Sequence, residues 1–185
     1  MSDTSQITRD ALLALRCQAG DDPQAYHDLV AEFERPLLYF SARLLGDENA
    51  ALDVLQQVWW TAFRRLRRLE HPEQLRRWLY TVARAAAIDM IRKRDATYRQ
   101  EREYAQEVAE SVCEPEFDDS TAEAIHEGLG ALPLALREVL TLHFLEELPV
   151  VDVAAIVGCP VGTVKSRLYH AKRQLRKILD ACHES

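Results

Sequence analysis

The stretch that decides the fold is "VVDVAAIVGCPVGTVKSRLYHAKRQLRK", residues 150–177. We expect an apolar helix that ends at Gly158, because glycine suits the left-handed position after a helix C-terminus. Pro160 disfavours a helical Cys159 and fits the first turn of a following helix. A short helix, a tight glycine turn and a second helix with a basic outer face are typical of a DNA-binding helix-turn-helix.

The second helix of this motif has two faces. Apolar residues at helical spacing predict a core stripe made of Val164, Leu168, Ala171, Leu175 and Ile178. The outer face is expected to meet DNA, since the first side chains of such a helix reach base edges while lysines and arginines contact phosphates. The candidate DNA contacts are Gly162, Thr163, Lys165, Ser166, Arg167, Tyr169, Lys172 and Arg173.

Charge is unevenly distributed along the 185 residues, whose net charge is -7. Residues 64–94 contain ten basic and three acidic side chains, whereas residues 95–131 contain eleven acidic and two basic ones. A single charged run usually marks a solvated face. Two basic runs on amphipathic helices, separated by an acidic segment, favour two surfaces for polyanions instead.

Helical periodicity dominates the chain, and we expect helices near residues 8–18, 22–45, 48–69, 73–94, 121–130, 134–146, 150–157 and 161–180. The predicted fold class is all-α, with two small helical domains joined by an acidic linker. The expected boundaries are residues 1–94 for the first domain, 95–120 for the linker and 121–185 for the domain that contains the helix-turn-helix.

Two helices of the first domain also have distinct faces. At 100° per residue, the helix over 52–69 has a core stripe of Leu52, Leu55, Trp59, Ala62, Phe63, Leu66 and Leu69. Trp60 falls on the polar face, where either a neighbouring helix or a partner protein must cover it. The helix over 75–94 has a core stripe of Leu75, Leu79, Val82, Ala83, Ala86 and Met90. Its opposite stripe is rich in arginine and ends in "RKR", as phosphate contacts require.

These segments resemble the extracytoplasmic-function (ECF) sigma factors of bacterial RNA polymerase. The resemblance rests on "ALPLALREVLTLHFLEELPVVDVAAIVGCPVGTVKSRLYHAKRQL" (131–175) for sigma region 4. It rests on "DVLQQVWWTAF" (53–63) and "RRWLYTVARAAAIDMIRKR" (76–94) for sigma region 2. Both blocks occur in the family's order and at its spacing. Ala85 departs from the family pattern, which usually has Asn there, and Pro149 and Pro160 stand where the family often has Ser.

The resemblance implies a transcription initiation factor that binds core RNA polymerase and directs it to promoters. Its implied polymerase contacts are Asp53, Gln56, Gln57 and Trp60. Its implied contacts to the −10 promoter element are Arg77, Arg84, Ile88, Arg92, Lys93 and Arg94. The loop over 69–74, with Trp78 and Tyr80 nearby, is the expected place where unstacked bases are captured. Trp78 also fits the edge of the buried stripe, and we favour a core role for it. The helix from Val161 is implied to read the −35 element. The resemblance leaves open an anti-sigma factor as a further partner.

Other classes of protein fit the sequence less well. No apolar run reaches the ~18 residues of a membrane span and the N-terminus shows no signal-peptide pattern, so no membrane insertion and a cytoplasmic location are expected. The four cysteines lie far apart, and we expect no metal site and no cofactor. We find no nucleophile–base pair or phosphate loop that would suggest an enzyme. The alternatives are a stand-alone helix-turn-helix regulator and an adaptor whose basic faces bind acidic partners.

Overall fold

The computed structural model describes residues 2–20, 22–104 and 128–183, and every regular element in these ranges is helical. The N-terminal helices are α1 (Ser2–Ala19), α2 (Pro23–Leu45), α3 (Glu48–Arg65) and α4 (Leu75–Tyr104), with short turns of 3-10 helix at η1 (Leu66–Arg68) and η2 (Pro72–Gln74). The C-terminal helices are α6 (Leu134–Leu140), the π-helical turn η3 (Thr141–Leu145), α7 (Val150–Val157) and α8 (Val161–His183). The prediction of an all-α fold is confirmed.

Two side-chain caps and one glycine set the start of α2 and the turn between α2 and α3. The side chain of Asp22 accepts the backbone N–H of Gln24 at 3.0 Å, so α2 begins directly after it. Gly46 ends α2 in the left-handed conformation with a φ of 66°. One residue later, the Asp47 side chain accepts the N–H of Asn49 at 2.9 Å and begins α3. These local signals explain why the predicted bounds of α2 and the predicted start of α3 agree with the structure, whereas α3 ends at Arg65 and not at residue 69.

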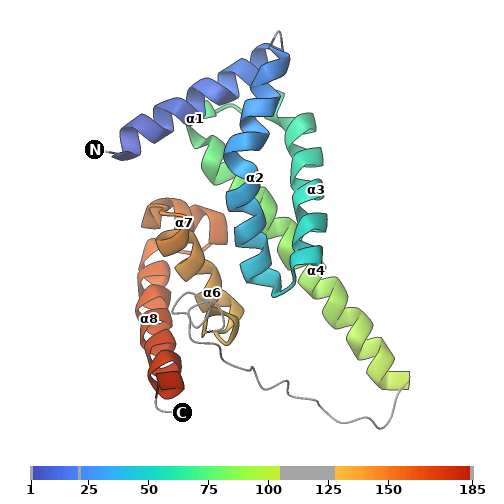
Figure 1. Cartoon of the computed structure of the whole chain (residues 1–185), viewed down its shortest axis with the longest axis vertical. Coiled ribbons are helices and arrows are strands. Elements are labelled where there is room, and N and C mark those ends of the chain that lie inside the picture. Colours follow the sequence, from blue (N-terminus) through green and yellow to red (C-terminus); the bar gives the residue numbers. More distant parts are fainter. Residues whose placement is uncertain (1, 21, 105–127, 184–185) are drawn as a thin grey trace.

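The N-terminal and C-terminal helices share one apolar core. Figure 1 shows the C-terminal helices, in orange and red, lying beside α2 and the first half of α4. The main core cluster joins Phe40 and Leu79 of the N-terminal helices to Leu142 and Val153 of the C-terminal ones. A smaller cluster of Leu129, Leu132, Leu140 and Ala171 holds α6 against α8. The two groups of helices therefore pack into one body.

Helix α4 is longer than the sequence pattern suggested. The predicted helix over 73–94 continues to Tyr104, and its far end projects away from the other helices (Figure 1). No proline or glycine interrupts residues 95–104, so the helix does not stop where the charge changes sign. The rest of the predicted linker, 105–120, lies outside the described residues, and of the helix predicted over 121–130 only residues 128–130 are described.

The buried stripe of α3 differs from the predicted one. Leu55, Ala62 and Leu66 are buried as expected, but Leu52 and Phe63 are 46% and 45% exposed. Ala51, Val54 and Val58 are buried instead. Because α3 packs against both α2 and α4, the side that faces these neighbours is rotated from the centre of the apolar stripe. Leu52 and Phe63 are therefore left on an outer apolar strip.

Candidate nucleic-acid and polymerase interfaces

The C-terminal helices form the predicted helix-turn-helix. Helix α7 ends at Gly158, which has a φ of 71° and whose N–H donates to the carbonyl of Ala154 at 3.0 Å. The N–H groups of Thr163 and Val164 donate to the carbonyl of Pro160 at 2.9 and 3.1 Å, which starts α8 directly after the proline. The left-handed conformation of Gly158 and the proline before α8 thus set the sharp turn that the sequence predicted.

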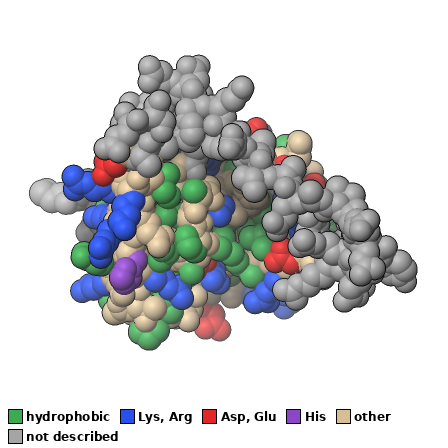
Figure 2. Space-filling view, turned by 90° about the horizontal axis from the view of Figure 1, so that it is seen from below, with side chains coloured by type: hydrophobic (Ala, Val, Ile, Leu, Met, Phe, Trp, Pro, Cys, Tyr) green, Lys and Arg blue, Asp and Glu red, His purple; other side chains and the backbone are tan. Residues whose placement is uncertain are grey.

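The outer face of α8 is basic and accessible. Val164, Leu168 and Ala171 are buried, and Leu175 and Ile178 are half-buried, so the predicted core stripe is confirmed. Of the eight candidate contacts to the −35 element, Arg167 is half-buried and the others are exposed. Figure 2 shows Lys and Arg side chains along the edge of the molecule on which α8 lies in Figure 1. The Lys172 ammonium lies 4.2 Å from the centre of the Phe144 ring, which orients it on this face.

The candidate −10 residues of α4 fall into two sets. Arg92, Lys93 and Arg94 are exposed on the second half of the helix, and Ile88 is half-buried. Arg77 and Arg84 instead form ion pairs with the C-terminal helices. Arg77 lies 3.5 Å from Asp152 and also donates to the side chain of Gln74, and Arg84 Nε lies 2.8 Å from Glu138. The structure therefore leaves the three cations of the first set exposed, whereas Arg77 and Arg84 are half-buried in ion pairs.

Tyr80 is a correction to the sequence interpretation. It was expected near the site that captures bases, but its side chain is fully buried, and its hydroxyl donates to Glu146. Burial, together with the Glu146 carboxylate, raises the pKa of Tyr80, while burial raises the pKa of Glu146 despite that hydrogen bond. The reason is that the C-terminal helices cover the side of α4 on which Tyr80 lies. Tyr80 is therefore a buried contact between helices.

The loop between α3 and α4 surrounds a pocket of about 520 Å³. Leu69, Glu70, His71 and Gln74 of the loop line it with Trp78 of α4, and Arg65 and Arg68 complete its wall. The sequence predicted the loop and favoured a core role for Trp78, which is half-buried against the main core and also lines the pocket. The two arginines were not predicted. An aromatic ring, a side-chain amide and guanidinium groups are the groups that stack on, hydrogen-bond to and neutralise an unstacked nucleotide.

The candidate polymerase contacts form one exposed face of α3. Asp53, Gln56, Gln57 and Trp60 are all exposed. The Trp60 side chain is 67% exposed, and the Arg64 guanidinium lies 5.4 Å from its ring centre. The described helices therefore leave most of this ring uncovered, which favours the partner protein over the neighbouring helix as its cover.

Glu138 is the site residue that sequence reasoning missed. Its side chain is 3% exposed, and it lies between Arg84 of α4 and Arg167 of α8, at 2.8 and 3.5 Å. A signal for it exists in the sequence: Leu134, Glu138 and Leu142 are spaced four residues apart, so an acid stands in a row of leucines on one helix face. A buried carboxylate requires a cationic partner, and the sequence alone does not say which arginine supplies it.

In residues 2–20, 22–104 and 128–183 no three His, Cys, Asp or Glu side chains cluster as metal ligands would. None of the helices in the same ranges combines the length and the apolar character that a membrane crossing needs.

Both halves of the chain match models of known protein families. Residues 29–97 match the family model "Sigma-70 region 2", and residues 122–175 match "Sigma-70, region 4". The RNA polymerase sigma-H factor of Pseudomonas aeruginosa is 30% identical over 182 residues, which are 92% of this chain and 94% of that protein. The ECF RNA polymerase sigma factor SigW of Bacillus subtilis is 28% identical over 169 residues, which are 85% and 90%.

Solved structures share the fold. The sigma factor RpoE of Bartonella quintana, solved in complex with the anti-sigma factor NepR, superposes with a TM-score of 0.71 at 23% identity and covers 85% of this chain and 98% of its own. CnrH, solved with the cytosolic domain of CnrY, superposes with a TM-score of 0.70, also at 23% identity, and covers 93% and 97%. With both sigma regions matched in order, the chain belongs to the ECF sigma factors, the alternative sigma factors that direct RNA polymerase to specific promoters.

Proposed function

We propose that this sigma factor divides its task among three surfaces. The exposed face of α3, made of Asp53, Gln56, Gln57 and Trp60, binds core RNA polymerase. The second half of α4 and the pocket beside its start bind the −10 element, and the outer face of α8 binds the −35 element as duplex. The observation that supports this division best is the uncovered Trp60 ring, because a DNA-binding helix-turn-helix alone gives no reason for it.

Promoter opening follows from the same surfaces without any bond-making step. Bases that leave the duplex stack in the pocket around Trp78, and the arginines at its wall neutralise the adjacent phosphates. The exposed Arg92, Lys93 and Arg94 position the strand farther along α4. The chain thus acts as a binding protein rather than as an enzyme, and the opened strand is held by contacts that the duplex does not offer.

The domain roles follow the same division. Residues 1–94 hold polymerase and the −10 element, residues 121–185 read the −35 element, and residues 95–120 connect them. The connector contains Glu107, Glu110, Glu114 and Glu116. In holoenzyme it lies in the RNA exit channel of core polymerase, where its negative charge imitates a nucleic acid. Core polymerase works in the cytoplasm, which is the compartment that we propose. An anti-sigma factor is a further proposed partner, since the structurally similar RpoE of Bartonella quintana was solved in complex with the anti-sigma factor NepR.

Co-elution with core polymerase tests this proposal. The purified chain is passed over a sizing column with and without core polymerase, and its affinity for duplex DNA is measured over a range of salt concentrations. We expect the chain to move to the polymerase fraction and to bind duplex DNA weakly by itself. Tight autonomous binding to one operator without co-elution would favour a stand-alone regulator. Co-elution with no salt-dependent DNA affinity of the complex would favour an adaptor.

A further inference from the structure

Helix α1 exposes an uncharged stripe on the side opposite its buried face. Leu13, Ala14 and Cys17 are buried in the main core. On the opposite side Leu12 and Leu15 are 60% and 51% exposed. A surface helix normally carries charged or polar side chains on this side. All residues of the stripe, which we call the α1 seam, are exposed: Ser5, Thr8, Leu12, Leu15 and Ala19.

The spacing of the α1 seam is that of a helix that pairs with another helix. Its members follow one another at alternating intervals of three and four residues, which is the pattern of the a and d positions of a coiled coil. One partner helix can therefore cover the whole stripe. Within residues 2–20, 22–104 and 128–183, no segment covers the two leucines of the seam. The seam is thus one half of a helix pair.

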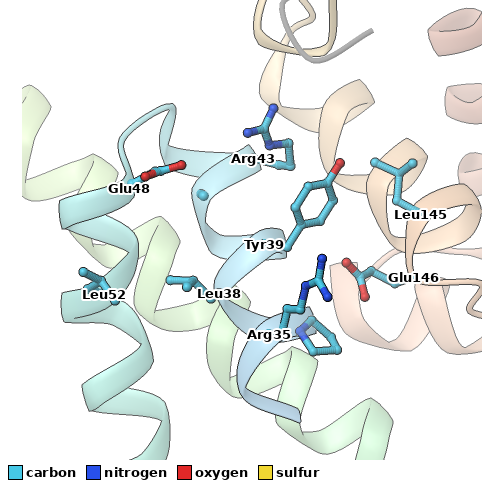
Figure 3. Close-up of a pocket in the computed structure, with 10 residues that line it drawn as sticks. Arg35, Leu38, Tyr39, Arg43, Glu48, Leu52, Leu145 and Glu146 are labelled. Atoms are coloured by element: carbon cyan, nitrogen blue, oxygen red, sulfur yellow. The ribbon is translucent and has the colours of Figure 1, made fainter. Parts of the chain in front are cut away.

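Leu52 and Leu145 are also exposed, but they lie among charged groups. They line a pocket of about 520 Å³. Figure 3 shows Arg35, Glu48 and Glu146 around this pocket. The α1 seam, in contrast, contains no charged residue. An uncharged stripe with two leucines at its centre favours burial against another protein surface.

Ion pairs to α2 border one side of the α1 seam. Arg9 lies 3.0 Å from Glu32, and Arg16 lies 2.6 Å from Asp22 and 2.8 Å from Asp28. Two guanidinium groups are thus matched by three carboxylates, so this border carries no excess of positive charge. Anionic lipids and nucleic acids both require such an excess. The charges therefore favour a protein helix as the partner of the seam.

A second copy of α1 has the matching surface. When two α1 helices run antiparallel about a two-fold axis between Leu12 and Leu15, Leu12 of each copy faces Leu15 of the other. Neither Arg9 nor Arg16 then faces a cation of the second copy. The positive N-terminal end of each helix also lies toward the negative C-terminal end of its partner. The seam is therefore self-complementary, as a two-fold interface requires.

We propose that the α1 seam is a self-association face through which two copies of the chain pair reversibly. The inference goes beyond the proposed function and requires none of the surfaces assigned there. Figure 1 shows α1 at the end of the molecule away from the last turns of α4. A single helix pair is smaller than a standard interface of about 1,600 Å². The pair is therefore weak, with a dissociation constant of roughly 10–500 µM.

Sedimentation equilibrium of the full-length chain tests this pair. The average mass should rise from 21.2 kDa toward twice that value as the concentration passes through the dissociation constant. Leu12→Glu and Leu15→Arg each place a charge in the apolar seam, and each should weaken association about tenfold or more. Both leucines are exposed, so the variants keep the fold.

A mixture of the two variants tests the antiparallel geometry. In the mixed pair the introduced carboxylate of one copy faces the introduced guanidinium of the other, while the second pair of leucines is kept. We therefore expect the mixture to associate more strongly than either variant alone. A mixture that associates no better than the separate variants would overturn the antiparallel arrangement.

Val151→Glu is the matched control. Val151 of α7 is 65% exposed, so this variant introduces the same charge at an apolar side chain outside the seam. Its mass should follow that of the wild type at every concentration. Association of Leu12→Glu as strong as that of the wild type would overturn the proposal. A wild-type mass that stays at 21.2 kDa up to about 1 mM would also overturn it.

Vesicles of phosphatidylglycerol test the other class of partner. We expect the wild-type chain not to sediment with them. A chain that stays single and sediments with the vesicles, while Leu12→Glu does not, would overturn the proposal in favour of a membrane. The proposed function fails separately, when the chain does not bind core polymerase.

Discussion

Replacing Trp60 with alanine separates binding to polymerase from folding. The ring is 67% exposed in the chain, so little of it stabilises the fold. Its contact with Arg64, 5.4 Å from the ring centre, contributes about 0.5–1 kcal/mol at an exposed site. Alanine recovers part of this through its higher helix propensity. We therefore expect the free energy of unfolding to fall by less than about 1 kcal/mol.

The effect of Trp60→Ala on polymerase binding should be much larger. A buried Trp covers roughly 150–250 Å², so the exposed two thirds of this ring offer roughly 100–170 Å² to a partner. At about 25 cal/mol per Å², complete covering contributes roughly 2.5–4 kcal/mol as an upper limit. Binding hot spots begin at about 2 kcal/mol. We expect the affinity for core polymerase to fall roughly 30- to 1,000-fold.

A competition assay against labelled wild-type chain on core polymerase measures this loss, and urea unfolding measures stability in parallel. Leu12→Ala is the matched control, because Leu12 of α1 is 60% exposed and lies outside the proposed interface. That control should bind polymerase as the wild type does. Wild-type affinity of Trp60→Ala would refute the assignment of this face, and so would a loss of stability large enough to explain weaker binding by unfolding.

Three other perturbations test the fold and its titrating groups. Burial raises the pKa of Cys17 to about 11, so in a variant whose other cysteines are serine its thiol should react with a thiol reagent more than ~100-fold slower than in unfolded chain. Gly158→Ala places a Cβ at a φ of 71° and should lower the free energy of unfolding by about 1–2 kcal/mol, as denaturant titration would show. The hydrogen bond from Arg16 lowers the pKa of Asp22. The stability that this ion pair contributes is therefore present above the ordinary pKa of the carboxyl and is lost as the pH falls through the lowered value. Asp22→Asn should therefore show a shallower acid-induced loss of stability in pH-dependent melting, and an unchanged acid limb would contradict it.

Local patterns predicted most of the fold. The turn at Gly158 and Pro160 and the core stripe from Val164 to Ala171 depend on residues that are neighbours in the chain, so periodicity and turn chemistry sufficed. The exposed position of Trp60 followed from helical geometry alone. The length of α4 was not predicted, because we ended the helix where the composition becomes acidic after Arg94, although no helix-breaking residue stands there.

Contacts between distant segments were beyond the sequence pattern. Arg84 and Glu138 are 54 residues apart, and no spacing rule pairs them. Tyr80 and Arg84 fall on a side of α4 that a single-helix analysis leaves to DNA, whereas packing of the C-terminal helices covers it. The same reason explains why Leu52 and Phe63 are exposed, because the side of α3 that is buried depends on where α2 and α4 lie.

Transcription by reconstituted holoenzyme tests the central claim most directly. Core RNA polymerase is incubated with the purified chain and a pool of genomic fragments, and the 5′ ends of the transcripts are mapped against reactions with core polymerase alone. Start sites that appear only with the chain, and that share two upstream elements at a constant spacing, are the predicted result. A transcript profile identical to that of core polymerase alone would contradict the account.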